Sequence, residues 1–150
     1  MQLADPQTES RATRRNVGFL LAKASQRWNE LLYERFVEHG YAEVRPAYGS
    51  ILLPLFEEDD LRIGELGRRA RLAKQTMTTM VRLLERDGLV TRRPDRDDAR
   101  ATRVALTPKA RRFRLVAEGV LSELDDLLVR SLGSDRTLQL TQDLKEVAAL

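Results

Sequence analysis

The residues best suited to chemistry lie between Arg62 and Arg103, where basic side chains are concentrated. This segment holds 12 Arg and Lys against 6 Asp and Glu, whereas the net charge of the whole chain is only +3. A basic patch attracts phosphate through its local potential rather than through the total charge. The distribution therefore indicates a nucleic-acid partner, with chance clustering on a solvated surface as the alternative if charge stood alone.

The residues that usually build an enzyme site are missing from the sequence. The chain has no cysteine and one histidine, so it offers no disulfide, no thiolate site and no histidine pair for a metal. No nucleophile with a matching base and no phosphate-cradling glycine loop is found. The carboxylates at 57–60 and 95–98 fit a solvated turn and a hairpin tip. We expect no enzyme, no cofactor and no metal site.

The sequence also gives an expectation for location. No stretch approaches the roughly 20 uninterrupted apolar residues that span a bilayer, and Met1 to Arg15 lacks the apolar segment of a secretory signal. We expect a cytoplasmic protein without a membrane partner.

The N-terminal third predicts an arm and two helices. Met1 to Thr13 is polar and predicts a loose arm. Apolar residues at three- and four-residue steps predict a long helix from about Arg14 to Glu38. A second helix begins at Arg45-Pro46, and Pro54 within it predicts a bend or an early end near Leu53.

The central segment has the order helix, turn, helix, hairpin. Helices are predicted at about 63–70 and 74–87 with a three-residue turn between them, and Gly88 closes the second. Strand-like runs at 89–93 and 101–106 flank a charged, turn-rich tip. This order describes a winged helix-turn-helix, in which the second helix lies in the major groove of DNA.

The C-terminal third predicts two more helices. Thr107-Pro108 is a strong helix start, and leucine-rich helical spacing continues to Gly133, after which Ser134 can cap a last helix. With aromatic residues at only 5%, the fold class expected is mainly α with a small β-hairpin wing.

The residues of the second motif helix divide by face. Met77 and Met80 belong to an apolar stripe that predicts core. The opposite side exposes amide, hydroxyl and guanidinium groups that can bond base edges and phosphates. The candidates for DNA contact on this helix are Lys74, Gln75, Thr76, Thr78, Thr79 and Arg82. On the hairpin, Arg92, Arg93 and Arg103 are predicted as phosphate anchors.

From Arg45 to Arg112 the sequence resembles the multiple antibiotic resistance regulator (MarR) family in detail. The resemblance is carried by the segments IGELG at 63–67, LLERDGLV at 83–90 and DDARATRVALT at 97–107, and the flanking helices extend it to most of the chain. It implies that Arg100 enters the minor groove and that Asp98 helps to orient it, in agreement with the negative potential of that groove. The sequence departs from the family at Arg62 and Ala73, which replace the small hydroxyl residues that usually cap the two motif helices.

Two long helices offer more apolar surface than a domain of this size can bury, which implies a partner surface. The resemblance implies a homodimer, with residues 14–39 and 108–150 as dimerisation helices, residues 45–107 as the DNA-binding lobe, and 1–150 as one domain. A larger monomeric helical core is the alternative.

The resemblance further implies a regulator, expected to be a repressor, that covers promoter DNA until a small organic, often aromatic, effector releases it. Residues that could line an effector pocket are Trp28, Phe36, His39, Tyr48 and Phe113, although each is more often core or surface. A winged helix that binds a protein and has no DNA target is the competing hypothesis, and the exposed arginines argue against it.

Overall fold

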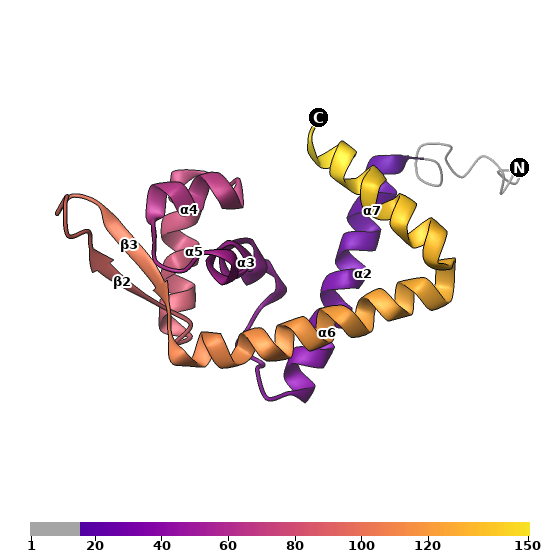
Figure 1. Ribbon diagram of the computed structural model, residues 1–150, viewed down its shortest axis with the longest axis horizontal. Coiled ribbons are helices and arrows are strands. Elements are labelled where there is room, and N and C mark those ends of the chain that lie inside the picture. The colour runs from indigo at the N-terminus through magenta and orange to yellow at the C-terminus, as the bar shows by residue number, and fades with distance from the viewer. Residues whose placement is uncertain (1–15) are drawn as a thin grey trace, which may run out of the picture.

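The computed structural model describes residues 16–150. Figure 1 shows two lobes above one long helix, α6, which runs from beneath the sheet to the far end of the molecule. The elements in chain order are α2 (Val17–Glu38), η2 (Pro46–Tyr48), α3 (Gly49–Glu57), β1 (Leu61–Arg62), α4 (Ile63–Ala70), α5 (Lys74–Arg86), β2 (Val90–Pro94), β3 (Thr102–Leu106), α6 (Pro108–Leu132) and α7 (Ser134–Ala148). The predicted class, mainly α with a small wing, is confirmed.

The helix starts follow from local capping. The Asn16 side chain accepts a hydrogen bond from the Phe19 amide at 3.1 Å at the start of α2. Thr107 accepts one from Ala110 at 3.2 Å at the start of α6, as predicted. Ser134 is the first residue of α7 rather than its cap. The predicted arm at 1–13 and the predicted helix start at Arg14 lie outside the described residues.

Of the two outcomes predicted for Pro54, a bend or an early end near Leu53, the early end is wrong. Helix α3 continues through Pro54 to Glu57, and the amide of Glu58 still bonds the carbonyl of Pro54 at 3.0 Å. The bond that proline removes would have reached Ser50, which is exposed, so water can satisfy that carbonyl. The buried face of α3 holds both halves of the helix on the core; it consists of Ile51, Leu52 and Leu55.

The wing is a three-stranded antiparallel sheet with the order β1-β3-β2. The predicted hairpin is confirmed, and its register pairs Val90 with Leu106 and Pro94 with Thr102. The two-residue strand β1, which pairs Leu61 with Val104, was not predicted because two residues show no alternation. It ties the start of α4 to the wing.

The core lies in the lobe built by α3, α4, α5 and the sheet, and it extends along α6 to the end of α2. The rings of Phe36 and Phe113 meet edge to face there, with centroids 4.9 Å apart. Beyond this point the helices are less covered, and no residue of α7 is buried. The exposed apolar side chains of this region, called the arm surface below, are Val17, Phe19, Leu20, Leu127, Val129, Leu138, Leu144 and Val147. Within residues 16–150, no helix has the length and hydropathy needed to cross a bilayer.

Candidate nucleic-acid interface

Helix α5 has one buried face and one exposed polar face, as the sequence predicted. Met77, Val81 and Leu84 are buried, and Met80 packs against them. Gly67 of α4 lets the two helices approach, since a Cβ there would lie 3.2 Å from Cγ of Met77. Among the predicted contact residues, Thr78 is half-buried and the exposed ones are Lys74, Gln75, Thr76, Thr79 and Arg82.

Two threonine hydroxyls on this helix donate hydrogen bonds to its own backbone. Thr78 and Thr79 donate to the carbonyls of Lys74 and Gln75, at 3.1 and 3.2 Å. Their oxygens can therefore only accept from a partner. Within residues 16–150, no carboxylate pairs with Arg82, so its guanidinium is available to solvent or ligand.

The ends of the motif helices agree with the departures seen in the sequence. Neither Arg62 nor Ala73 makes a side-chain cap. Helix α4 ends at Arg71, which adopts the left-handed conformation with φ 54°, and three residues separate α4 from α5 as predicted. Arg62 instead extends toward the wing, where it meets a carboxylate.

That carboxylate is Asp95, the one buried charged residue among those described, with 5% exposure. Arg62 binds both its oxygens at 3.0 Å, and Arg103 binds Oδ2 at 2.8 Å. The guanidinium of Arg62, followed by that of Arg103, holds the pKa of the Asp95 carboxyl well below its usual range. Sequence reasoning missed this cluster because it placed Asp95 among the solvated residues of the hairpin tip; the poor cap at Arg62 was the available signal.

The wing tip brings Arg100 and Asp98 together as predicted. Asp98 Oδ1 accepts the amide of Arg100 at 3.0 Å and lies 3.8 Å from its Nε. The Arg100 side chain is 96% exposed and projects from the tip. Asp98 therefore shapes the backbone that carries Arg100 more closely than it holds the guanidinium.

The acidic run at 57–60 is exposed except at the half-buried Asp60, as expected of a solvated turn, but Asp59 and Asp60 also bind basic residues. Asp60 pairs with Arg93 and with Arg103, the latter at 3.1 Å. Asp59 accepts the amide of Leu106 at 2.8 Å and pairs with Arg111 at 3.2 Å. The run anchors the wing and the start of α6, because the strand pairing brings it beside basic residues that are distant in sequence.

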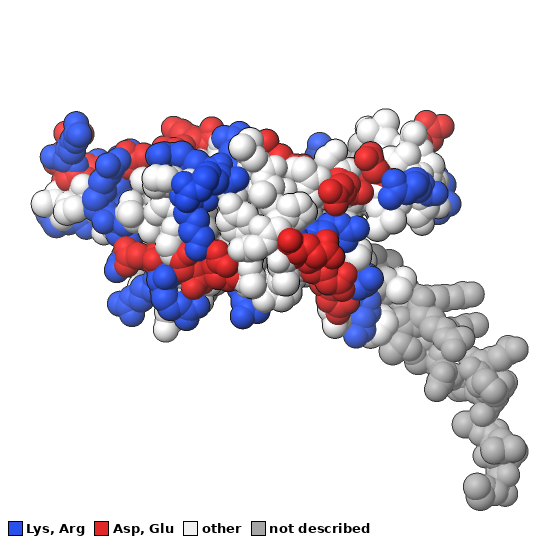
Figure 2. All heavy atoms as spheres, turned by 90° about the horizontal axis from the view of Figure 1, so that it is seen from below, with Lys and Arg blue, Asp and Glu red and all other residues white. Residues whose placement is uncertain are grey.

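The three predicted phosphate anchors each have an internal carboxylate partner. Arg92 binds both oxygens of Glu85, at 2.9 and 3.1 Å, and thereby lowers the pKa of that carboxyl. The side chain of Arg93 is 56% exposed and remains accessible beside Asp60, whereas that of Arg103 is only 30% exposed. Figure 2 shows the result from below: blue side chains spread over the wing end, with red ones between them.

A groove of about 590 Å³ lies between α4, α5 and the wing. Its walls include Lys74 and Thr78 of α5, Arg92 of β2, and Arg100 of the tip. One edge of the second motif helix, with Lys74 and Thr78, and the projecting wing arginine therefore border one basic depression, whereas Gln75, Thr76, Thr79 and Arg82 lie outside its lining.

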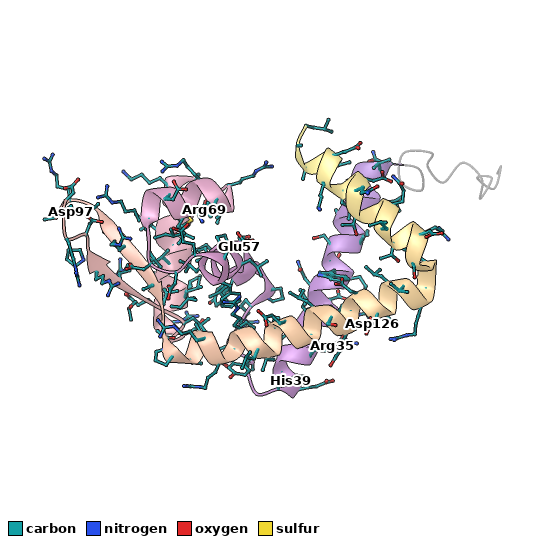
Figure 3. The ribbon with its side chains drawn as sticks, in the orientation of Figure 1. Arg35, His39, Glu57, Arg69, Asp97 and Asp126 are labelled. Atoms are coloured by element: carbon teal, nitrogen blue, oxygen red, sulfur yellow. The ribbon has the colours of Figure 1, made fainter. Side chains whose placement is uncertain are left out.

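The five predicted pocket residues are not gathered around one cavity. Phe36, Tyr48 and Phe113 are buried in the core, Trp28 is half-buried, and His39 lies exposed at the end of α2 (Figure 3). The Tyr48 hydroxyl donates to Asp87 Oδ2 at 2.6 Å. A separate open hollow of about 690 Å³ lies between α2 and η2, lined by Ala22, Ser25, Gln26, Asn29, Glu30, Tyr33, Arg45 and Pro46.

Comparison with known proteins identifies related regulators. The family model described as "MarR family" matches residues 46–102. The HTH-type transcriptional repressor YetL of Bacillus subtilis is 31% identical over 123 residues, which cover 73% of this chain and 72% of that protein. Against two other curated transcriptional regulators, the chain spans 64% and 31% of their lengths.

Solved structures show the same fold. The transcriptional repressor CouR, solved bound to a 23-mer DNA duplex, matches with a TM-score of 0.78 at 24% identity, covering 89% of this chain and 93% of that one. PcaV of Streptomyces coelicolor, solved with its natural ligand, matches with a TM-score of 0.75 at 21% identity, covering 99% of this chain and 98% of that one. Because it has a winged helix-turn-helix and is similar to YetL over most of both chains, this protein is a transcriptional regulator of the MarR family.

Proposed function

We propose that a homodimer of this chain binds double-stranded DNA at a specific sequence and represses transcription by covering promoter DNA, without enzymatic activity of its own. The observation that carries the proposal is the basic groove between α5 and the wing. Double-stranded DNA offers a major groove for a helix and an adjacent minor groove for a projecting arginine. The DNA-bound structure of CouR, which shares the fold, supports this mode of binding.

In this proposal α5 reads the major groove. Gln75 and Arg82 are exposed and offer the bidentate groups that recognise adenine and guanine edges. Thr76 and Thr79 lie beside these two residues and accept hydrogen bonds from base edges, while Lys74 and Thr78 flank the phosphate backbone.

The wing supplies the remaining contacts. Arg100 enters the minor groove, and Asp98 holds the backbone turn from which it projects. Arg92 and Arg93 reach phosphates from their exposed positions on β2, each while bound to a carboxylate. For Arg103 we propose an internal role instead of the phosphate contact expected from the sequence, because its guanidinium bonds Asp60 and Asp95.

The dimer is proposed from the arm surface. Residues 45–107 form the DNA-binding lobe, and residues 14–39 and 108–150 supply the dimerisation helices of the single domain. The support is the row of exposed apolar side chains on α2, α6 and α7, which a second copy would remove from water. Two lobes would then meet half-sites about one DNA turn apart.

Release by a small organic effector is the last part of the proposal. The hollow lies between α2, one of the proposed dimerisation helices, and η2 of the winged lobe. The guanidinium carbon of Arg45 lies there, 5.2 Å from the centroid of the Tyr33 ring. The structure of PcaV with its natural ligand supports a ligand-responsive mode. Trp28 lies on α2, which forms one wall of the hollow, and His39 caps the end of that helix, whereas Phe36, Tyr48 and Phe113 would have to leave the core to meet a ligand.

The test is binding to the DNA upstream of the chain's own gene, across a salt series, for the wild type, Arg100→Ala and Arg130→Ala. Arg130 is an exposed arginine at the far end of α6 and controls for the change in net charge. We expect Arg100→Ala to weaken binding by about 1–3 kcal/mol, roughly tenfold to hundredfold, and Arg130→Ala to have little effect.

Equal affinities of Arg100→Ala and Arg130→Ala for this DNA would show that the wing arginine is not part of the interface. If the wild type bound the upstream DNA no better than a scrambled duplex, the alternative of a protein-interaction module would replace the regulator of that promoter.

A further inference from the structure

The buried carboxylate of Asp95 accepts hydrogen bonds from two arginines and from two backbone amides of the wing tip. Besides the bonds from Arg62 and Arg103, its Oδ1 accepts the amides of Asp97 at 2.9 Å and Asp98 at 3.1 Å. Five hydrogen bonds therefore converge on one side chain that is 3% exposed. They join the start of α4, the strand β3 and the tip of the wing.

These bonds determine the shape of the loop that carries Arg100. The amide of Asp95 donates to the carbonyl of Ala101 at 2.9 Å, and the amide of Ala101 donates to the carbonyl of Asp98 at 2.9 Å. Together with the carboxylate bonds, they fix the loop backbone on both sides of Arg100. An arginine on a preorganised loop loses less conformational entropy when it binds.

The same bonds determine which arginines can meet DNA. Arg62 borders the basic groove with a side chain that is 48% exposed, but its guanidinium is bound to both oxygens of Asp95, which is only 3% exposed. The carboxylate that binds Arg92 is itself 38% exposed and restrains its partner less. Arg103 is held by Asp95 and by Asp60. Two positive charges beside the groove are thus paired internally, while Arg68, Lys74, Arg92 and Arg100 also line it. Contacts to phosphate raise affinity for every sequence alike, so removing two of them favours discrimination.

We propose that Asp95 is a specificity-determining positioning residue, which keeps Arg62 and Arg103 away from DNA phosphates and holds the loop of Arg100 in its binding shape. The inference rests on the proposed DNA-binding function.

Asp95→Asn tests it, with Asp97→Asn as the matched control. Asp97 lies at the same wing tip (Figure 3) and is exposed, so its replacement removes an equal charge from the same loop. Each protein is titrated against a duplex of the DNA upstream of its own gene and a scrambled duplex of the same length and composition. For Asp95→Asn we expect the affinity ratio of the two duplexes to fall at least tenfold. Binding to the scrambled duplex should become more salt-dependent, by about 0.9 in slope for each freed arginine that reaches a phosphate.

Asp97→Asn should raise both affinities together and leave their ratio unchanged. An unchanged ratio in Asp95→Asn would overturn the inference. A wild type that does not distinguish the two duplexes would overturn the proposed function, and the inference with it.

Arg62→Met is a second test that leaves the bonds from Arg103 and the loop amides in place. Because the inference places Arg62 away from the phosphates, the salt dependence of DNA binding should have the same slope for Arg62→Met as for the wild type. A slope lower by about 0.9 per protomer would show a phosphate contact and refute the inference. Amide hydrogen exchange of the free proteins gives a reading without DNA: the amides of Asp97 and Asp98 should lose protection in Asp95→Asn and keep it in Arg62→Met.

Discussion

Replacing Tyr48 by phenylalanine tests whether the reading helix is held by the hydrogen bond at its C-terminal end. The Tyr48 hydroxyl donates to Asp87, the C-cap of α5, at 2.6 Å, and Tyr48 is only 3% exposed. A hydrogen bond to a charged group contributes about 1.5–3 kcal/mol. Asp87 keeps bonds from Arg86 at 3.2 and 3.3 Å, and its side chain is 14% exposed. We therefore expect the lower end of that range, about 1.5 kcal/mol.

For a chain of 150 residues, this loss corresponds to a decrease in Tm of roughly 3–6 °C. The matched control is Tyr33→Phe, because the Tyr33 hydroxyl also makes one bond, to the carbonyl of Ala42 at 3.0 Å, but at an exposed site. Its loss should cost less than about 1 kcal/mol. The assay is thermal and urea unfolding followed by circular dichroism at one fixed protein concentration, since dimerisation would make Tm depend on concentration.

The pKa of Asp87 gives this prediction a dependence on pH. Burial raises that pKa, but the hydrogen bonds from Arg86 and Tyr48 outweigh burial and lower it below its ordinary value. The stabilisation is therefore present above the unfolded pKa near 3.8 and is lost as pH falls through the folded pKa. The difference between Tyr48→Phe and the wild type should shrink in acid. Equal losses for Tyr48→Phe and Tyr33→Phe at neutral pH would refute the reasoning.

Three further predictions concern stability and assembly. Gly88→Ala should lower unfolding free energy by about 1–2 kcal/mol because Gly88 has φ +76°, whereas Gly64→Ala, within α4 and with open space around it, should raise it by about 0.5–1 kcal/mol. Acid should destabilise the protein as pH falls below about 4, because the pKa of the Asp95 carboxyl is lower in the folded chain than in the unfolded one. In urea titrations, the unfolding free energy of Asp95→Asn should depend less on pH in this range than that of the wild type. Leu144→Glu, at a position 43% exposed on α7, should shift the protein from dimer to monomer in sedimentation velocity.

The architecture could be predicted from the sequence because its signals are local. The apolar stripe of α5, the cap at Thr107 and the turn-rich hairpin tip each depend on neighbouring residues. The faces of α5 followed from the same periodicity, and the pairing of Arg100 with Asp98, which the family resemblance implied, spans only two residues.

The ion pairs that organise the site could not be predicted in this way. Arg62 and Asp95 are 33 residues apart, and Arg103 and Asp60 are separated by 43. The short strand β1, which has no recognisable periodicity, pairs Arg62 with Arg103 and, together with the hairpin register, brings these groups together. Pro54 failed as a breaker for a similar reason, since burial of α3 against distant residues outweighs the local loss of one hydrogen bond.

The pairing of charges changes what the basic segment implies. Its excess of positive charge suggested an interface in which many arginines meet phosphate, but Arg62, Arg92 and Arg103 each bind a carboxylate through two or more bonds. The cations left accessible are the exposed side chains of α5, the exposed Arg92 and Arg93 of β2, each beside a carboxylate, and the exposed Arg96 and Arg100 of the tip. Since phosphate contacts set affinity and base contacts set specificity, a MarR-family chain built in this way should have a modest salt slope for its net basic charge and depend strongly on the few residues that reach the bases.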